Sequence, residues 1–420
     1  MIYIVSLYYS PLTNPPAFRM AHLVRILEKK YGADNIRVVT GRPNYPHGKL
    51  HPEHKWKAFC RETGEFDETI DHIYEFPAAF KGLYRKTLGL ISFSLSVFFY
   101  FLSRKMHKDD IVLVTSGPVF PIYSILFLSY IKRRFRYIVD VRDLWPQVVA
   151  GMGFMQEDST GYRNLLKLSE ATYRRAIALV GNSQGICSYL AEVAPKVNVS
   201  LIFNPIDTEK LFVPLSKHDQ RVFKEEHSDV FPEDGRPVFL FSGTFSSYIG
   251  LANLFHALKK LKTFSEKFRF IMIGQGEGED GMRQFIEEND FDDQMKIILF
   301  MPREDLVSYI CAADFCFASL RDSPMLRYAI PTKIIEYLAC DKNVVAVIGG
   351  PFAEMLKREN AAYICKPGDV DGLANLLQSL IGQSPGKDTD SQPRAFIEGN
   401  FGLKPFEDEF SNLFDGTISH

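Results

Sequence analysis

The chain has 420 residues, of which 46% are hydrophobic and 24% are charged. These are the values of an ordinary globular protein, and they exclude a disordered, collagen-like or low-complexity chain. The 49 basic residues are balanced by 51 acidic ones, so the chain is not one of the strongly basic proteins that coat nucleic acid, and we expect no nucleic-acid partner. At roughly 100–200 residues per domain, the length predicts two domains.

Cysteine usage and the N-terminus predict the compartment. The six cysteines are scattered and form no Cys-x-x-Cys pair, which is typical of free thiols in a reducing compartment. Met1 runs directly into the apolar segment 2–5, with no basic region before it and no small-residue cleavage site after it. This start predicts a β-strand instead of a secretory signal, and with it a cytoplasmic protein.

The N-terminal half alternates predicted strands and helices. Residues 2–7 have the pattern of a short buried strand, residues 18–30 carry apolar side chains at helical spacing, and residues 37–40 return to a strand. Further strands are predicted at 111–114, 137–139, 178–183 and 199–203. Such an alternation is typical of a parallel α/β sheet.

Two apolar helices are predicted between these strands. Residues 87–102, the most hydrophobic stretch, would span about 24 Å as a helix, which is short of the roughly 30 Å of a bilayer core. We therefore expect a buried helix, or one that lies in the membrane surface. The second apolar helix, 119–131, precedes the basic run 132–136. That run suits an anionic membrane surface and, equally, a solvated helix end whose dipole favours cations.

The alternation restarts in the C-terminal half. Residues 213–236 are charged and lack periodicity, and strands are then predicted at 238–241, 268–273, 296–300, 315–318 and 344–348. We predict an N-terminal domain at 1–205, a second domain at 206–390, and a C-terminal helical segment at 391–420 that packs back toward the first domain. The cleft between the two domains is the expected ligand site.

The richest motif begins at Pro331 and reads Pro-Thr-Lys-Ile-Ile-Glu. Pro331 suits the first turn of a helix, where the free N–H groups attract a phosphate. Lys333 adds a positive charge there. Glu336, on the same helix face, can accept hydrogen bonds from two ribose hydroxyls. The pattern fits a nucleotide grip or an ordinary surface Lys–Glu pair, and spacing alone favours the surface pair.

This run, preceded by Leu320-Arg321-Asp322-Ser323-Pro324, resembles the nucleotide-binding segment of the retaining family 4 glycosyltransferases. It is most similar to the bacterial subgroup that extends O-antigen, capsule and exopolysaccharide precursors, including N-acetyl-L-fucosamine transferases. Other motifs of the subgroup follow in order: 43–46, 140–146, 182–183, 204–207, 273–276 and 313–314. The resemblance implies the B-type glycosyltransferase fold, an α/β architecture of two Rossmann-like domains facing across a cleft, and a metal-independent reaction.

The resemblance also implies a donor site. It places Glu336 at the nucleotide ribose, and Lys333 with the loop 327–332 at the diphosphate. The other donor-binding residues that it implies are Arg327 and Thr332 of that loop, Gly243 and Thr244 in the first tight turn of the nucleotide domain, Gly274 and Gly276 in the turn beside the base, and Arg19 in an N-terminal loop that faces the donor.

Three residues are the catalytic candidates. Lys333 is expected to stabilise the leaving diphosphate, and Asp143, with Arg142, occupies the strand end where relatives place a His-Asp pair near the sugar. The sequence departs from the family at three places. Tyr328 stands where many relatives have a first Glu, Ile249 stands where many have a Lys, and Arg142 replaces the usual His. Neutralising the diphosphate would then fall on Lys333, Arg327 and backbone N–H groups.

We therefore predict a cytoplasmic enzyme, bound peripherally to the inner face of the cell membrane. It would move a sugar, with retention, from a nucleotide-sugar donor, UDP favoured over GDP, to a polyprenyl-linked or growing polysaccharide acceptor. The resemblance implies no cofactor and no metal. His47, His51 and His54 cluster as metal ligands do, but they lie in a proline-rich loop, which does not favour a zinc site. Two alternatives stay open: a sugar-nucleotide epimerase on the same fold, and a non-catalytic scaffold of a polysaccharide assembly, which Tyr328 would suit.

Overall fold

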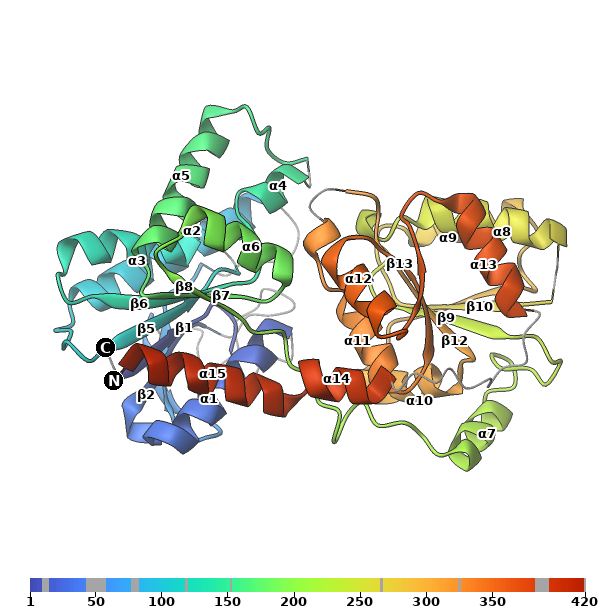
Figure 1. The fold of residues 1–420 in the computed structure, drawn as a ribbon, viewed down its shortest axis with the longest axis horizontal. Coiled ribbons are helices and arrows are strands. Elements are labelled where there is room, and N and C mark those ends of the chain that lie inside the picture. The colour runs from blue at the N-terminus through green and yellow to red at the C-terminus, as the bar shows by residue number, and fades with distance from the viewer. Residues whose placement is uncertain are drawn as a thin grey trace. The chain divides into compact units, whose positions relative to one another are not determined.

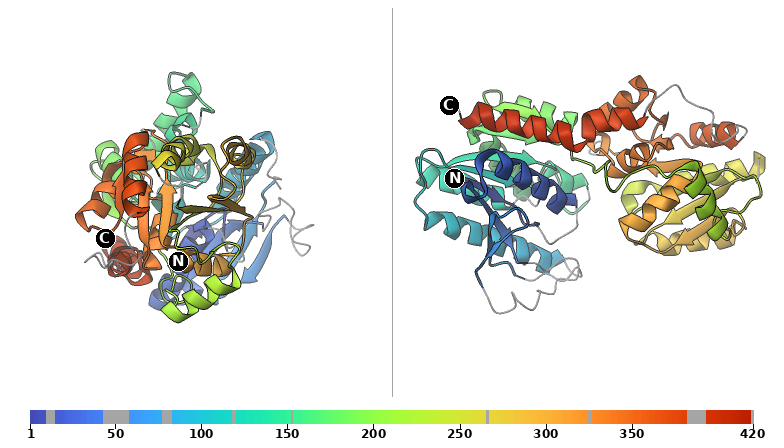
Figure 2. Two further views of the ribbon diagram at one scale, coloured as in Figure 1. Left: turned by 90° about the vertical axis from the view of Figure 1, so that its right-hand side faces the viewer. Right: turned by 90° about the horizontal axis from the view of Figure 1, so that it is seen from below.

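The structure is a computed structural model that describes residues 1–9, 15–42, 58–76, 83–117, 120–151, 153–264, 267–323, 326–381 and 393–418. The chain forms two compact units (Figure 1). The first comprises Met1–Asn204 with Lys404–His420, and the second comprises Pro205–Leu403. Each unit is a sheet with helices on both of its faces (Figure 2).

The first unit contains an eight-stranded sheet in the order β3-β4-β2-β1-β5-β6-β7-β8. The strands are β1 (Ile2–Val5), β2 (Ile36–Gly41), β3 (Cys60–Thr63), β4 (Thr69–Ile73), β5 (Ile111–Thr115), β6 (Arg136–Val141), β7 (Ala178–Gly181) and β8 (Asn198–Leu201). Neighbouring strands are parallel, except that the edge strand β3 is antiparallel to β4. The central strands β1 and β5 are almost entirely apolar, because both faces of a parallel sheet are covered.

Helices cover the two faces of this sheet. They are α1 (Pro15–Tyr31), α2 (Leu83–Leu102), α3 (Phe120–Ile131), α4 (Gln147–Gly151), α5 (Thr160–Arg175), α6 (Gln184–Val193) and α15 (Leu403–Ile418). α1 and α15 share one hydrophobic cluster with alternate strand residues such as Ile4 and Leu113. Tyr3, which alternates with Ile4 on β1, meets Phe101 of α2 with ring centroids 5.3 Å apart. α2 therefore covers the opposite face.

The second unit contains a six-stranded parallel sheet in the order β11-β10-β9-β12-β13-β14. The strands are β9 (Val238–Ser242), β10 (Arg269–Ile273), β11 (Met295–Ile298), β12 (Phe315–Ser319), β13 (Asn343–Val347) and β14 (Tyr363–Cys365). The chain moves outward from β9 to β11 and then returns to the other side of β9 at β12. Parallel α/β sheets bind ligands at the carboxyl ends of the strands where the order reverses, which here are β9 and β12.

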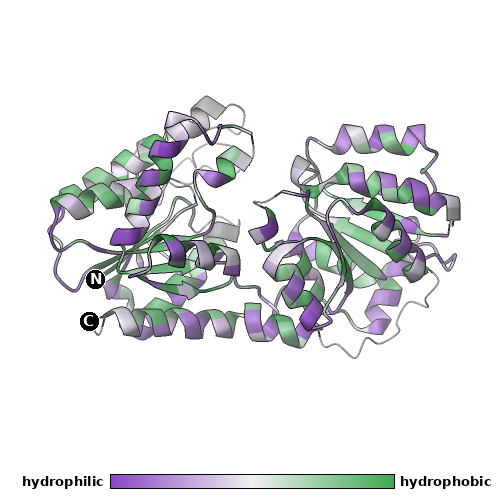
Figure 3. Ribbon diagram, turned by 45° about the horizontal axis from the view of Figure 1, so that its top comes forward, coloured by the Kyte–Doolittle hydropathy of each residue, from purple (hydrophilic) through white to green (hydrophobic). Residues whose placement is uncertain are grey.

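Aromatic side chains fill much of the second core. The ring of Phe239 stacks with those of Phe270 and Phe315 at centroid distances of 5.9 and 5.1 Å. In Figure 3 the strands of both sheets are coloured mainly as hydrophobic. The surrounding helices are α7 (Lys217–Glu226), α8 (Leu251–Phe264), α9 (Glu279–Glu288), α10 (Arg303–Ala312), α11 (Thr332–Ala339), α12 (Gly350–Arg358), α13 (Val370–Ile381) and α14 (Pro393–Phe401).

The two C-terminal helices belong to different units. The guanidinium of Arg394, on α14, donates to the carbonyl oxygens of Thr208, Phe212 and Ala339, all in the second unit. Phe410 and Phe414 of α15 are fully buried in the cluster that contains α1. The segment predicted at 391–420 is thus divided, with α14 in the second unit and most of α15 in the first.

The apolar stretch 87–102 lies within α2. Across the parts of the chain that the structure describes, no helix has both the length and the apolar character needed to cross a membrane.

Candidate functional site

Helix α11 is fixed to the carboxyl end of β9 by a buried hydrogen-bond pair. The backbone N–H of Ser242, the last residue of β9, donates to Tyr337 Oη at 2.8 Å, and Ser242 Oγ lies 2.9 Å from the same oxygen. Tyr337 is fully buried. The arrangement joins residues 95 positions apart, and it places the first turns of α11 beside the predicted tight turn at Gly243.

Lys333 extends from α11 over that turn. A Cβ on Gly243 would lie 2.5 Å from Lys333 Cε and 2.7 Å from Nζ, so it would displace the end of this side chain, and the φ of +130° at Gly243 itself favours glycine. The ammonium lies 4.1 Å from the centroid of the Phe241 ring, in cation–π geometry. Burial lowers the pKa of Lys333 to about 8, and the Glu336 carboxylate partly opposes that shift. A perturbed amine at the carboxyl edge of a parallel sheet is typical of a functional site.

Glu336 is buried one turn further along the same helix. Its Oε1 lies 3.2 Å from a terminal nitrogen of Arg303, the first residue of α10. Burial raises the pKa of Glu336, while the charges of Arg303 and Lys333 lower it. Sequence reasoning did not find Arg303 or Phe241, because nothing in the spacing of the chain pairs them with residues 333–336. The carboxylate is thus held in a fixed place by a cation on a neighbouring helix.

The two glycine turns approach each other backbone to backbone. The N–H of Gly243 donates to the carbonyl of Ile273 at 2.8 Å. A Cβ on Gly274 would lie 1.9 Å from the carbonyl oxygen of Gly243, and one on Gly276 would lie 2.5 Å from that of Phe245. The turns after β9 and β10 can therefore approach this closely only because glycine occupies the points of contact.

We expect Gly274→Ala to destabilise the second unit by about 2–3 kcal/mol, because the backbone must move away from the new methyl group. The matched control is Gly281→Ala on α9, where a Cβ would meet no atom within 4 Å. That change should stabilise the helix by up to about 1 kcal/mol. Thermal unfolding by calorimetry measures both. Equal stability of the two variants would show that the two turns do not need their close approach.

Three further predicted donor residues, Arg327, Thr332 and Thr244, are exposed. Arg327 lies in a short 3-10 turn, Leu326–Tyr328, and pairs with Asp322 at 3.4 Å, with both side chains largely exposed. Such a pair is weak, so the Arg327 side chain is not held rigidly by it. Thr332 opens α11 and is exposed, as is Thr244 after β9. Pro331 provides no side-chain cap for the helix.

Arg142 and Asp143 belong to the first unit and directly follow β6. The backbone N–H of Arg142 donates to Ser116 Oγ at 3.0 Å, at the end of the neighbouring strand β5. Within the described residues, the buried Nε of Arg142 has no hydrogen-bond partner. Burial lowers the pKa of Arg142 and raises that of Asp143, although Asp143 keeps an exposed surface. Both residues therefore lie at the carboxyl edge of their own sheet.

Arg19 lies in a different environment from the predicted one. Its guanidinium is fully buried, donates to both carboxylate oxygens of Asp140 at 2.7 and 3.1 Å, and donates to the carbonyl of Phe203 at 2.8 Å. It also lies over the rings of Phe406 and Phe410. This burial contradicts the prediction that Arg19 faces the donor. Its hydrogen bonds join α1 to β6 and to the segment after β8, and its ring contacts add α15, all inside the first unit.

The structure thus brings Gly243, Gly274, Lys333 and Glu336 to one edge of the second sheet, while Arg142 and Asp143 lie in the other unit. The motif at 43–46 and the three histidines at 47, 51 and 54 fall outside the described residues.

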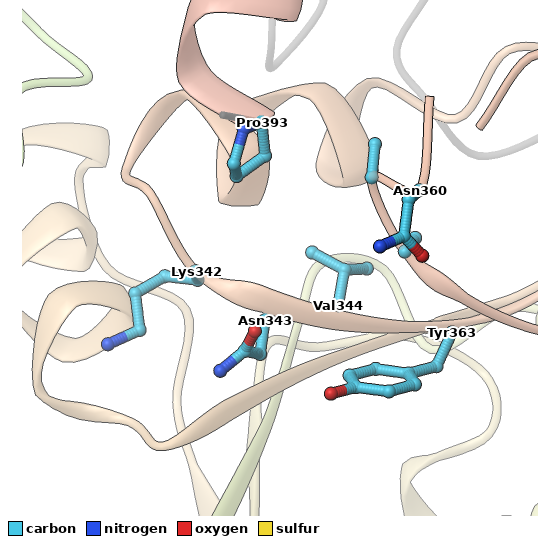
Figure 4. A pocket seen from close by; sticks show the side chains of 8 residues that line it. Lys342, Asn343, Val344, Asn360, Tyr363 and Pro393 are labelled. Carbon is cyan, nitrogen blue, oxygen red and sulfur yellow. The ribbon is translucent and has the colours of Figure 1, made fainter. Parts of the chain in front are cut away.

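A small pocket at the opposite edge of the second sheet is separate from this site (Figure 4). It has a volume of about 30 Å³, and Lys342, Asn343 and Tyr363 are among the residues that line it. These residues lie at the amino ends of β13 and β14. The volume is enough for about one water molecule, so the pocket does not compete with the carboxyl edge as a ligand site.

Comparisons with known proteins find similarity to glycosyltransferases. Residues 222–397 match the family model of the Glycosyl transferases group 1. The chain is 25% identical to the probable glycosyltransferase WbjE of Pseudomonas aeruginosa over 78% of this chain and 80% of WbjE. It is 21% identical to the putative colanic acid biosynthesis glycosyl transferase WcaI of Escherichia coli, over 82% of this chain and 84% of WcaI.

Solved structures show the fold. The crystal structure of Alr3699/HepE from Anabaena in complex with UDP matches with a TM-score of 0.68 at 16% identity, and the match covers 99% of both chains. The predicted B-type fold with two Rossmann-like domains is confirmed. Lys333, Glu336 and the glycine turns all fall within the residues that match the family model. The similarity to the Glycosyl transferases group 1 model thus extends over residues 222–397.

Proposed function

We propose that the chain is a retaining glycosyltransferase of bacterial surface polysaccharide synthesis, in the subgroup that resembles N-acetyl-L-fucosamine transferases. It transfers a sugar from a UDP-linked donor to a polyprenyl-linked or growing polysaccharide acceptor. The observation that carries the proposal is the placement of Lys333 and Glu336 on one short helix, held by Tyr337 to the end of β9. The name of WcaI, the match to WbjE and the UDP in the HepE structure support the pathway and the nucleotide.

Lys333 is suited to stabilise the leaving group. Breaking the bond between sugar and phosphate develops negative charge on the diphosphate, and a positive charge already held in place lowers the energy of that state. Burial lowers the pKa of the Lys333 ammonium, and the negative charge of a bound diphosphate would raise that pKa again and keep the group protonated. The free N–H groups in the first turn of α11 point in the same direction as the helix dipole and add to this stabilisation.

Glu336 is suited to hold the ribose. A carboxylate accepts hydrogen bonds without donating any, so it matches two neighbouring hydroxyl groups. Arg303 keeps this carboxylate in position from α10. Because the hydrogen bonds to a charged acceptor form in a mostly buried place, they contribute more to affinity than bonds at an exposed surface.

We further propose that Asp143 and Arg142 position the sugar or the acceptor. In a same-face reaction, the acceptor oxygen forms the bond to the anomeric carbon as the bond to the phosphate oxygen breaks. The acceptor hydroxyl proton passes to that leaving phosphate oxygen. This scheme balances without a protein nucleophile, a cofactor or a metal, and exclusion of water from the closed site would suppress hydrolysis of the donor.

Calorimetric titration with UDP and with GDP tests the nucleotide site. We expect UDP to bind, and Glu336→Gln to weaken its affinity about 10- to 100-fold, which corresponds to the loss of a charged acceptor. The matched control is Glu354→Gln on α12, an exposed carboxylate that pairs with Lys357 and should leave binding unchanged. Absence of binding to either nucleotide by the folded protein would overturn the proposal and favour a non-catalytic scaffold.

A further inference from the structure

One face of α2 is apolar and exposed. Ile91, Leu95, Phe99 and Leu102 follow each other at spacings of four, four and three residues, so they lie on one side of the helix. Their exposed fractions are 39%, 53%, 61% and 39%. The other side of α2, with Phe93 and its neighbours one turn apart, is buried against the sheet. The helix is therefore hydrophobic on the side that faces the core and on the side that does not.

α3 extends this exposed surface. Ser94 Oγ of α2 lies 2.7 Å from Ser124 Oγ of α3, and Lys132 Nζ donates to the carbonyl of Arg104 at the far ends of both helices. The two contacts join residues that are 30 and 28 positions apart in the sequence. Because this separation stays nearly constant along the helices, α2 and α3 run side by side in the same direction. The C-terminal turns of α3 carry three more exposed apolar side chains: Phe127 (50%), Tyr130 (62%) and Ile131 (57%).

We call these seven side chains of α2 and α3 the apolar face. Single apolar residues at a surface are ordinary, but a group of them on two adjacent helices marks an interaction site. The same helices end in a concentration of positive charge. Residues 104–110 and 132–136 contain seven Lys or Arg and two Asp, a local net charge of +5 in a chain whose net charge is -2.

The cations of this basic rim are accessible. Lys105, Lys108, Arg133 and Arg134 are exposed, whereas the carboxylate of Asp110 is already paired with the chain's N-terminus at 3.2 Å. The exposed Asp109 is then the one remaining carboxylate among the described residues 104–110 and 132–136, and the cations of the rim outnumber it.

A second group of cations adjoins this end of α2. The fully buried carboxylate of Asp71 is shared by Arg61 at 2.7 Å and Arg104 at 3.3 Å, with Arg37 4.0 Å away. In the described parts of the chain, the buried Nε of Arg37 has no hydrogen-bond partner. Three guanidinium groups around one carboxylate leave an excess of positive charge, which suits phosphate oxygens.

We propose that the apolar face and the basic rim bind an anionic lipid bilayer, with α2 and α3 lying in the plane of the headgroups. Apolar side chains that enter the interface and a rim of cations that meets acidic headgroups are the two attractions that hold an interfacial helix. The net charge of +5 in the rim favours an anionic bilayer as the occupant. The inference rests on the proposed function, because a polyprenyl-linked acceptor resides in such a bilayer.

Sedimentation of the full chain with vesicles tests this surface. We compare vesicles of phosphatidylcholine alone with vesicles of phosphatidylcholine and phosphatidylglycerol in equal parts. Binding to the anionic vesicles should be at least about tenfold stronger, and it should weaken as salt is added. Leu95→Glu with Phe99→Glu should reduce binding at least about tenfold, and Arg133→Glu with Arg134→Glu should reduce binding to the anionic vesicles alone.

Two matched controls should bind like the original chain. Phe154→Glu changes an aromatic side chain with an exposed fraction of 63%, close to that of Phe99, outside the apolar face. Lys210→Glu with Lys217→Glu reverses two exposed charges of the second unit. Thermal unfolding checks that all variants are folded.

Unchanged vesicle binding in the Leu95/Phe99 variant, or no binding of the original chain to either vesicle, would overturn the inference. Sedimentation velocity distinguishes another occupant: if the original chain dimerises and the Leu95/Phe99 variant does not, a second copy covers the face and the bilayer assignment is wrong. UDP titration is a separate readout. A chain that binds UDP but no vesicles contradicts only the membrane surface, whereas a chain that binds vesicles but no nucleotide contradicts only the proposed function.

Discussion

Lys333→Met is expected to lower the rate of sugar transfer about 100- to 1,000-fold, because under the proposed function it removes the positive charge that stabilises the leaving diphosphate. The side chain lies over Gly243 and the Phe241 ring, so a methionine of similar length can occupy its place without disturbing the turn. The measurement is transfer from a radiolabelled UDP-sugar to a membrane fraction that contains the acceptor. The rate constant should fall more than the affinity for UDP.

The control for this substitution is Lys357→Met, which removes an exposed lysine of α12 that pairs with Glu354. Its transfer rate should equal that of the original enzyme. A Lys333→Met enzyme within about threefold of the original rate would rule out Lys333 as the leaving-group stabiliser, because one such donor typically contributes 100-fold or more.

The pKa of Lys333 gives a second test. Since this pKa is about 8, the ammonium of the free protein is lost as the pH rises from 7 to 9, and UDP affinity should fall over that range. The affinity of Lys333→Met should not change there. The pKa of Lys333 in the folded protein lies below its usual value of 10.5, so below pH 8 the buried ammonium lowers the free energy of unfolding. This cost disappears as the pH rises from about 8 to 10.5. Lys333→Met should therefore raise the melting temperature of the unliganded protein at pH 7 but not near pH 11.

Asp140→Asn is expected to lower the free energy of unfolding of the first unit by about 3–5 kcal/mol, because the buried guanidinium of Arg19 loses its counter-charge. Both side chains have no exposed surface, and two hydrogen bonds join them. Arg19 also donates to the carbonyl of Phe203, near the end of this unit's main segment. Calorimetric unfolding, or the urea midpoint followed by the fluorescence of the two tryptophans, measures the change.

A surface pair in the same unit is the control. Arg174 and Glu170 lie four residues apart on α5 at 2.7 Å, and the arginine side chain is 54% exposed. Glu170→Gln should cost no more than about 0.5 kcal/mol, because water solvates both charges when the pair is broken. If Asp140→Asn costs as little as Glu170→Gln, the Arg19 charge is not trapped in the core, and its assignment as a structural residue is wrong.

Local patterns in the sequence were sufficient for the main elements of both sheets. The apolar runs at 111–114, 238–241 and 268–273 correspond to β5, β9 and β10, since strands buried on both faces leave a continuous hydrophobic signal. The weaker elements were missed. β3 and β4 carry polar residues and depend on pairing with each other and with β2. α7 lies in the charged stretch 213–236 and has no buried residue to create a periodic pattern.

The candidate site shows the same division. The sequence by itself determined that Lys333 and Glu336 share one helix face and that glycines follow two strands, because helix periodicity and turn chemistry are local. Spacing alone still favoured a surface pair over a nucleotide grip, and it did not indicate that Arg19 is buried.

Only the tertiary structure decided those points. Glu336 meets Arg303 from another helix, and Arg19 meets a carboxylate 121 residues away. Elements that are distant in the chain bury these charged side chains. The shifts in their pKa values, and whether they can reach a ligand, are therefore decided only when the helices and sheets pack together.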